Sequence, residues 1–488
     1  MNEEHIFQEL VKICGSKNIS NDPDLLDDYS ADLSFVKGTK PIYVIWLYKT
    51  KQIEKVIKLA NSLEFSVIPV SSSSPERYHG DTIPQKGNCI IIDLSRMNKI
   101  LSIDRKNRVI MIEPGVTFGQ LLLILQKKGL RLLLPLLPRE DKSILTAALE
   151  RSPTTIPRYQ WDSSDPLLCT EVVFGTGDLF RTGTAAGPGS IKQQKKSGQA
   201  QVNPMGPTQF SPYRLIQGAQ GSLGIVTWAT LKLELKPTIQ KVFHLQSENL
   251  LDLLNLQHQL LKYRLGDEIL ILNNINIACL VEKDLDQIEH LKNSLAEWNL
   301  IFVLAGRGSL ANDKISYQED DIFQMIEDLK LNYLLKKESP ISKSEIIHAL
   351  NEPTLYSWRN RLKGGFQDIF FITNYERIHK FISKVQNEIS DDVGIYIQAI
   401  NQGTSYHCEF DLFYDPNNKI ESSLIKEKYA KISIDLMDSG AFFNRPYGVW
   451  SKEVFKRQED NVQMALKKVK KIFDPNNVLN PGVLCFDP

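Results

Sequence analysis

The 488-residue sequence lacks the features that define several large classes of protein. Its 58 basic and 58 acidic residues cancel, so no overall field attracts nucleic acid or an anionic membrane. The most apolar stretch, residues 121–138, is interrupted by charged residues and by prolines, whereas a membrane span needs about 20 consecutive apolar residues. The acidic, amphipathic N-terminus is unlike a secretory or transit peptide. We therefore expect a cytoplasmic protein that neither binds nucleic acid nor inserts into a membrane.

Two further absences concern cofactors. The cysteines stand singly along the chain and no two have CxxC spacing, which excludes the common iron–sulfur and structural zinc motifs. No G-x-G-x-x-G run stands between a strand and a helix, so the dinucleotide-binding fingerprint of NAD enzymes is missing as well.

The patterns that are present indicate roughly two or three domains. PIYVIWLY, the amphipathic KTKQIEKVIKLANSLE and FSVIPV read as strand, helix and strand, the order of a βαβ unit. The alternating run GIVTWATLKLELKP closes at Pro237, where we place a domain boundary. Beyond it, strands such as ILILNNIN, IFVLAGRG and IYIQAI alternate with helices, which predicts an α+β domain around an antiparallel sheet.

Four segments then carry a resemblance that spans the chain from about residue 40 to its end. They are IIIDLSRMNKIL with VIMIEPGVTFGQL, CTEVVFGTGDLFRTG, LIQGAQGSLGIVTWATLKL and FDPNNVLNPGVL. In this order they resemble the FAD-binding family of glycolate oxidase flavin subunits and D-lactate dehydrogenases, within the vanillyl-alcohol oxidase and p-cresol methylhydroxylase group. The resemblance implies an α+β fold with a two-subdomain FAD-binding domain of the p-cresol methylhydroxylase type (residues 1–237). An α+β cap with an antiparallel sheet (238–465) and a tail that returns to the FAD domain (466–488) would follow.

The cofactor implied is FAD, bound non-covalently, although some relatives attach flavin through a histidine and His79 lies in the matching loop. The family's glycine-rich phosphate loop corresponds to residues 69–84, where serines replace the glycines. Two interpretations stay open: hydroxyls and backbone amides hold the pyrophosphate, or the phosphate site has been lost. We expect the first, in part because the glycines at 218, 221 and 224 let the backbone approach a ligand closely. The expected FAD contacts are Val70, Ser71, Ser72, Ser73, Ser74, Gly80, Asp81, Thr82, Pro138, Lys142, Ser143, Gly218, Gln220, Gly221, Gly224, Ile225, Val226 and Asn480.

Oxidation of a 2-hydroxy acid needs a cation for the carboxylate, a base for the hydroxyl proton and a flavin. Many relatives hold a metal with histidines, but the matching stretch here keeps only His407, with Glu409 two residues on. We expect no metal; a metal held by His407 and Glu409 is the alternative. His407 or Tyr447 is the expected base and Arg445 the expected carboxylate clamp. In the other interpretation His407 is a core histidine and Arg445 packs among aromatic rings. Residues 363–368 form a further candidate substrate loop.

The leading hypothesis is therefore an FAD-dependent dehydrogenase acting on CH–OH groups. Its substrate would be a small 2-hydroxy acid such as D-lactate or glycolate. Electrons would pass to a protein acceptor, either an electron-transfer flavoprotein or an iron–sulfur subunit. Two alternatives remain: a non-catalytic or electron-relaying subunit of a larger redox complex, and an enzyme that oxidises an aromatic alcohol.

Overall fold

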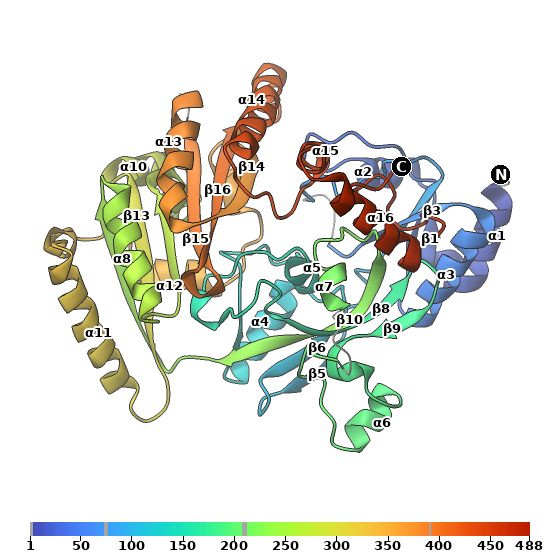
Figure 1. The fold of residues 1–488 in the computed structure, drawn as a ribbon, viewed down its shortest axis with the longest axis horizontal. Helices are drawn as coiled ribbons and strands as arrows, with labels where there is room; N and C mark the ends of the chain where they lie inside the picture. The colour runs from blue at the N-terminus through green and yellow to red at the C-terminus, as the bar shows by residue number, and fades with distance from the viewer. Residues whose placement is uncertain (1–2, 73–76, 207–211, 390–391) are drawn as a thin grey trace.

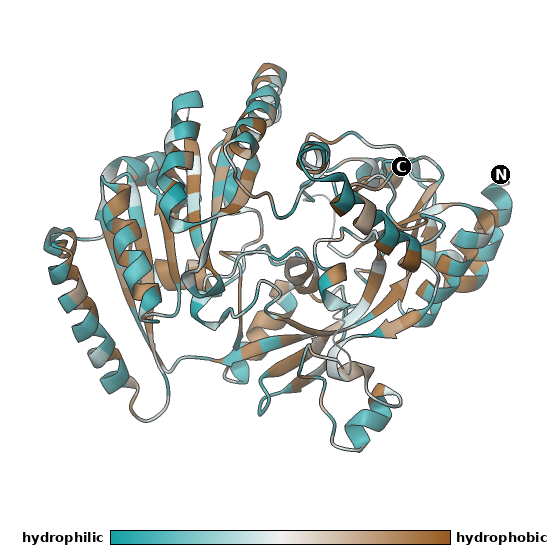
Figure 2. Cartoon of the chain, viewed as in Figure 1, coloured by the Kyte–Doolittle hydropathy of each residue, from teal (hydrophilic) through white to brown (hydrophobic). Residues whose placement is uncertain are grey.

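The computed structural model describes residues 3–72, 77–206, 212–389 and 392–488. Figure 1 shows two lobes, and both chain termini lie in the same one. We call this the N-terminal lobe (residues up to 237 and the returning C-terminal tail) and the other the cap lobe (the sheet that begins at residue 239, with its helices). In both lobes the strands are mostly hydrophobic, and the helices turn hydrophilic faces outward (Figure 2).

The first sheet of the N-terminal lobe has the order β1-β2-β4-β3, with β2, β4 and β3 parallel. Its strands are β1 (Ile19–Ser20), β2 (Tyr43–Trp46), β3 (Ser66–Val70) and β4 (Cys89–Asp93). Helix α3 (Thr50–Leu63) connects β2 to β3 and buries Ile53, Val56, Ile57 and Ala60, the spacing of an amphipathic helix. The predicted βαβ unit is confirmed, with β4 inserted between its two strands. Helices α1 (Glu3–Cys14) and α2 (Pro23–Ser30) complete this part of the lobe.

The second sheet of the lobe is antiparallel and is organised around the 12-residue strand β10 (Gly224–Leu235). Strands β6 (Val109–Ile112), β7 (Leu130–Leu132) and β8 (Leu167–Phe174) all pair with β10, while β5 (Ile100–Asp104) and β9 (Leu179–Arg181) form the edges. The helices of this part are α4 (Phe118–Lys127), α5 (Ile144–Leu149), α6 (Ile191–Lys196) and α7 (Tyr213–Ile216). Because β10 begins directly after the glycine-rich turn, this sheet fixes where the turn lies.

The cap lobe is built on a six-stranded sheet of order β11-β13-β12-β15-β16-β14, antiparallel throughout, as the sequence predicts. The strands are β11 (Ile239–Ser247), β12 (Ile269–Asn273), β13 (Trp298–Gly306), β14 (Gly365–Thr373), β15 (Val393–Ile400) and β16 (Ser405–Tyr414). One face packs against α8 (Leu250–Lys262), α11 (Ala311–Asp328), α13 (Ile378–Glu388) and α14 (Lys419–Asp438). The other packs against α9 (Asn274–Val281), α10 (Leu285–Ser294) and α12 (Lys343–Asn351), and against Leu136 and Leu137 of the N-terminal lobe.

The chain returns to the N-terminal lobe through α15 (Gly448–Lys456) and α16 (Asp460–Phe473). After α16, the tail lies beside β3: the N–H of Val67 donates to the carbonyl of Val478 at 2.7 Å, and the N–H of Asn480 donates to the carbonyl of Val67 at 2.9 Å. The buried Lys470 ammonium donates to the carbonyls of Ser222 and Leu479 at 2.6 and 2.8 Å. Among the residues the structure describes, no helix combines the length and apolar character that crossing a membrane requires.

A buried charge cluster joins the two lobes. The Arg131 guanidinium on β7 contacts the carboxylates of Asp267 and Glu268, which directly precede β12 of the cap sheet. All three side chains are at most 7% exposed. Arg307 and Arg158 also approach Asp267, but only Arg131 donates a hydrogen bond to Glu268 among the described residues. Since buried charges are tolerated only when paired, the cluster fixes the cap on the lobe beneath it.

Replacing Arg131 with Met is expected to lower the free energy of unfolding by about 3 kcal/mol or more, because it leaves Glu268 buried without its partner. Urea denaturation followed by circular dichroism measures the change. Arg307→Met is the matched control. Arg307 is more exposed and Asp267 keeps Arg131, so a loss below about 1 kcal/mol is expected. Equal losses in the two variants would contradict this role for Arg131.

Candidate active site

A cavity lies between the lobes and is lined by both. The N-terminal lobe supplies the end of β3, the segment from Pro135 to Pro153 and the turn that leads into β10. The cap supplies Trp358, Arg359, Phe366, Asp368, Tyr396 and Glu409. Arg445 and Tyr447, from the connection between α14 and α15, complete the wall. A ligand in this cavity would therefore contact both lobes at once.

Most of the expected FAD contacts line the cavity. They are Val70, Ser71, Ser72, Asp81, Thr82, Pro138, Lys142, Gly218, Gln220, Gly221, Gly224, Ile225 and Val226. Gly80, Ser143 and Asn480 lie directly behind this wall. The Ser143 N–H donates to Ser72 Oγ at 3.2 Å, and Asn480 Nδ2 donates to the carbonyls of Asp81 and Gln220 at 2.7 and 2.6 Å. Ser73 and Ser74 lie outside the described residues.

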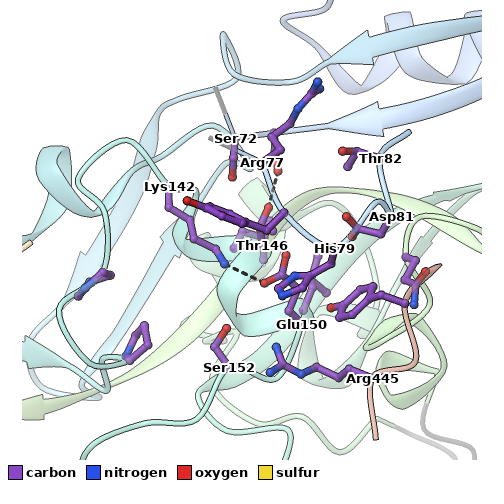
Figure 3. A pocket seen from close by; sticks show the side chains of 18 of the residues that line it. Ser72, Arg77, His79, Asp81, Thr82, Lys142, Thr146, Glu150, Ser152 and Arg445 are labelled. Carbon is purple, nitrogen blue, oxygen red and sulfur yellow. Dashed lines mark hydrogen bonds and ion pairs between the residues drawn. The ribbon is translucent and has the colours of Figure 1, made fainter. Parts of the chain in front are cut away.

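Ser71 and Ser72, two of the serines that replace the glycines, belong to a wall of hydroxyl groups. Ser71 Oγ lies 2.5 Å from Oγ1 of Thr146 on α5, a residue that the sequence did not single out. Thr82 Oγ1 is buried and has no hydrogen-bond partner among the described residues. Lys142 adds a positive charge and pairs with Glu150 at 2.9 Å (Figure 3). Hydroxyl donors and a cation beside a glycine turn fit a diphosphate, so these residues are suited to hold FAD.

The glycine turn packs tightly on the end of β3. Gly221 has φ of +71°, and a Cβ at this position would lie 2.6 Å from Cγ of Pro69. Glycine is required here for two reasons: the left-handed backbone and the close approach of the turn to the strand that begins the phosphate loop. The turn and the loop therefore form one wall of the cavity.

The cap side of the cavity carries a charge cluster of Arg359, Glu409 and Asp411, of which the sequence singled out only Glu409. Arg359 Nε donates to Glu409 Oε1 at 2.7 Å and to Asp411 Oδ1 at 3.1 Å, and its guanidinium lies 4.1 Å from the Trp358 ring. Burial raises the pKa of Asp411 well above its usual value, although Arg359 opposes this shift. Arg359 lies in the short 3-10 helix Trp358–Arg361 and belongs to no recognisable motif, so no local signal marks it.

Two of the three expected catalytic residues reach the cavity. Arg445 is 6% exposed, with its guanidinium 4.2 Å from the Phe370 ring, and Tyr447 lies beside it in the wall. His407 is 3% exposed and does not line the cavity; its Nε2 lies 3.0 Å from Glu409 Oε2. Burial lowers the pKa of His407, although Glu409 opposes the shift. His407 is thus a neutral histidine that positions Glu409 from behind.

The candidate substrate loop at residues 363–368 is only partly a loop, because β14 begins at Gly365. Phe366 and Asp368 point into the cavity, and Gln367, on the opposite face of the strand, donates to the carbonyl of Leu33 at 2.7 Å. Among the described residues, no three His, Cys, Asp or Glu side chains converge in a way that would hold a metal ion.

Comparison with known proteins agrees with this geometry. The FAD binding domain family matches residues 41–183. Glycolate oxidase subunit GlcD of Bacillus subtilis is 22% identical, over 98% of this chain and 96% of the relative. D-lactate dehydrogenase of Anaerostipes hadrus is also 22% identical, over 98% of this chain and 97% of the relative. The crystal structure of p-cresol methylhydroxylase with substrate bound has a TM-score of 0.81 at 19% identity, covering 100% of this chain and 98% of that one.

The chain is thus an FAD-dependent oxidoreductase with the fold of p-cresol methylhydroxylase, as the sequence predicts. It carries an FAD binding domain and is similar to glycolate oxidase subunit GlcD and to D-lactate dehydrogenase along nearly its whole length. The flavin cofactor is FAD.

Gly221→Ala is expected to weaken FAD binding by about tenfold or more, the equivalent of about 1.4 kcal/mol, because the new Cβ pushes the turn away from Pro69. Titration of the apoprotein with FAD, followed by the quenching of flavin fluorescence, measures the affinity. Gly198→Ala separates this clash from backbone strain, since Gly198 has φ of +81° but no atom lies within 4 Å of the position that its Cβ would take. Unchanged affinity in Gly221→Ala would contradict the placement of FAD against this turn.

Proposed function

We propose that this oxidoreductase acts on a small 2-hydroxy acid and passes the electrons to a protein acceptor. The observation that carries the proposal is the state of Arg445. Among the described residues, no carboxylate pairs with its guanidinium and Nε has no hydrogen-bond partner, although the side chain is only 6% exposed. Lys142 and Arg359, which also line the cavity, are paired with carboxylates: Lys142 with Glu150, and Arg359 with Glu409 and Asp411. Arg77 lines the cavity without a paired carboxylate in the described part of the chain, and its Nη2 donates to the backbone carbonyls of Asp28 and Ala31.

A buried guanidinium without an anion is costly. A ligand that brings a carboxylate to Arg445 removes this cost, and the planar fork of arginine matches a carboxylate with two parallel hydrogen bonds. Trp358, Phe366 and Tyr396 line the same space and exclude water from it, which strengthens the ion pair. This chemistry favours a small organic acid as the substrate.

FAD, when bound, supplies the acceptor for the hydride that leaves the substrate carbon. The residues of this chain bind and orient the substrate: Arg445 holds the carboxylate, and Tyr447 donates a hydrogen bond. Burial, with a further contribution from Glu150, raises the pKa of Tyr447 well above its usual value. The phenol therefore stays protonated, and Tyr447 acts as a donor rather than as the base.

The proposal of a protein acceptor has support from a relative. A mitochondrial protein of Arabidopsis thaliana named D-lactate dehydrogenase [cytochrome] is 21% identical over 92% of this chain and 75% of its own length. Every cysteine of this chain is a free thiol and five of the six are buried, so the described residues offer no cluster that would carry electrons onward. We therefore propose that the electrons pass to another protein, and an electron-transfer flavoprotein or an iron–sulfur subunit could accept them. We also propose that FAD is held without a covalent bond.

Aromatic alcohol oxidation is the second candidate, favoured by the aromatic side chains that line the cavity. The 4-cresol dehydrogenase flavoprotein subunit of Pseudomonas putida is 27% identical over 54% of this chain and 48% of the relative. In this case Arg445 would stabilise a phenolate oxygen in place of a carboxylate.

An anaerobic flavin-bleaching screen separates the two candidates. We expect D-lactate, glycolate or a related 2-hydroxy acid to bleach the visible absorption of bound FAD, and benzylic and 4-alkylphenolic alcohols to leave it unchanged. Bleaching by the aromatic set alone would replace the first candidate with the second.

Arg445→Met is expected to raise KM for the 2-hydroxy acid by about 30-fold or more, the equivalent of about 2 kcal/mol, with a smaller change in kcat. Arg445→Lys keeps the charge but loses the bidentate hydrogen bond, so its KM should lie between that of the wild type and that of Arg445→Met. Arg457→Met is the control, because Arg457 pairs with Asp438 and Glu453 away from the cavity. A KM that does not change in Arg445→Met would remove Arg445 from the substrate site.

A further inference from the structure

His79 and Asp368 form a pair that joins the two lobes inside the cavity. His79 belongs to the phosphate loop of the N-terminal lobe, and Asp368 belongs to β14 of the cap. Nε2 of the imidazole lies 3.1 Å from both carboxylate oxygens of Asp368. Both residues line the cavity, where His79 lies between Thr82 on one side and Arg445 on the other (Figure 3).

The backbone of His79 is held in a conformation that side chains rarely adopt. Its φ is +75°, and the following Gly80 also has φ of +75°. The N–H of Gly80 donates to Asp32 Oδ2 at 2.7 Å, which fixes the strained turn. Non-glycine residues keep such a conformation only where their surroundings enforce it, and these positions cluster at functional sites.

The imidazole ring is also fixed on its faces. It stacks on Tyr447 with ring centroids 4.7 Å apart and planes at 14°, and it meets the edge of Phe370 at 5.4 Å. With Nε2 directed at Asp368, the carboxylate selects the form in which Nε2 carries the proton and Nδ1 carries the lone pair. No described residue forms a hydrogen bond with Nδ1, and 19% of the side chain stays exposed.

The other candidates for a base are engaged or unsuitable. His407 lies behind Glu409, and Tyr447 stays protonated. Glu409 and Asp411 are both engaged by Arg359. Asp81 lines the cavity but has no side-chain partner among the described residues that would orient it. Glu150 is paired with Lys142. Among the described residues that line the cavity, the His79 imidazole combines a fixed partner that orients it with a nitrogen free to accept a proton.

We propose that His79 and Asp368 form the catalytic dyad of this enzyme, in which His79 Nδ1 accepts the hydroxyl proton of the substrate. This inference rests on the proposed oxidation of an alcohol. The O–H bond breaks, its proton goes to Nδ1 and its electron pair forms the new C=O bond. The C–H hydrogen would leave with its two electrons as a hydride, for which FAD, when bound, would supply the acceptor. Asp368 stabilises the imidazolium that results.

The charges around the dyad determine its pH dependence. Burial disfavours protonation of His79, but Asp368 and, more weakly, Glu150 outweigh it and raise the pKa of His79, while Arg445 opposes them. Burial would raise the pKa of Asp368, but His79 lowers it to about 2. Asp81 and the neutral Tyr447 phenol also face the ring. Since Nδ1 must be unprotonated to act, the rate of flavin reduction should rise with pH through the raised pKa of His79.

The test compares His79→Asn, Asp368→Asn and His290→Asn in the FAD-loaded protein. Asparagine tolerates the left-handed backbone at position 79, and His290 is an exposed histidine on α10 that serves as the control. Stopped-flow measurement of flavin reduction by the substrate across pH is expected to show a loss of about 100- to 10,000-fold in His79→Asn. His290→Asn should match the wild type. In Asp368→Asn the acid limb of the profile should move to lower pH, because the carboxylate that raises the pKa of His79 is gone.

Two readouts distinguish a base from a structural role. Exogenous imidazole should restore part of the rate in His79→Gly, which keeps the strained backbone without cost. A histidine NMR titration should show a resonance with a raised pKa that disappears in His79→Asn and shifts down in Asp368→Asn, while FAD affinity is retained in both.

The outcomes also separate the dyad from the proposed function. If 2-hydroxy acids do not reduce the flavin but another alcohol does, only the proposed substrate class is wrong. The variants are then measured with that alcohol. If the wild type is reduced but His79→Asn keeps its rate and its acid limb, the dyad is wrong. Loss of the acid limb in Asp81→Asn instead would transfer the role to Asp81. A wild type that no alcohol reduces would overturn both proposals.

Discussion

The cavity of this protein depends on charge pairing across the boundary between its two lobes. Arg131 with Asp267 and Glu268 joins the lobes outside the cavity, and His79 with Asp368 joins them within it. Among the described residues, Arg131 and Glu268 find an ion-pair partner only across the boundary, whereas Asp267 also pairs with Arg307 of the cap. A buried unpaired charge is far more costly than an exposed one. The pairs therefore determine the position of the cap, and with it the distance between the residues that hold FAD and those that would contact a substrate.

Arg445 differs from Lys142 and Arg359 in the cavity because no carboxylate of the described residues pairs with it. Paired charges stabilise the frame, whereas a preorganised charge without a partner is available to a ligand. Enzymes gain rate from groups that are fixed before the substrate arrives, since no reorganisation is then needed at the moment of reaction. In this protein the packing of Arg445 against Phe370 provides that fixation.

Ser71 and Ser72 stand where the related family carries the glycines of its phosphate loop. Ser71 and Ser72 are bonded to Thr146 and to the N–H of Ser143, so they form part of a polar wall that α5 and its preceding residues complete. The glycine requirement is met elsewhere, at Gly221, where the backbone must approach Pro69. Replacement of the loop glycines is therefore compatible with the FAD-binding domain that the comparisons show.

The sequence predicted the elements that depend on local pattern. The βαβ unit around α3, the antiparallel cap sheet and the glycine turn before β10 all follow from periodicity or from single residues with special backbone freedom. His407 and Glu409, two residues apart on β16, point the same way, and the imidazole Nε2 lies 3.0 Å from Oε2 of the carboxylate. The depth of His407 beneath the cavity was not predictable, since alternation along a strand fixes a face but not what covers it. Asp368 and Arg359 make contacts that no local pattern in the sequence could predict. Asp368 meets His79 across 289 residues of sequence, and Arg359 meets Glu409 across 50. Such contacts depend on how the two lobes dock, and no spacing within either segment encodes them.

A crystal structure of the FAD-loaded protein with a bound 2-hydroxy acid tests the central claim most directly. The account predicts isoalloxazine in the cavity between the lobes, the substrate carboxylate on the Arg445 guanidinium and the hydroxyl oxygen within hydrogen-bond distance of His79 Nδ1. A carboxylate bound elsewhere, or a cavity filled by side chains with no room for the flavin ring, would contradict it.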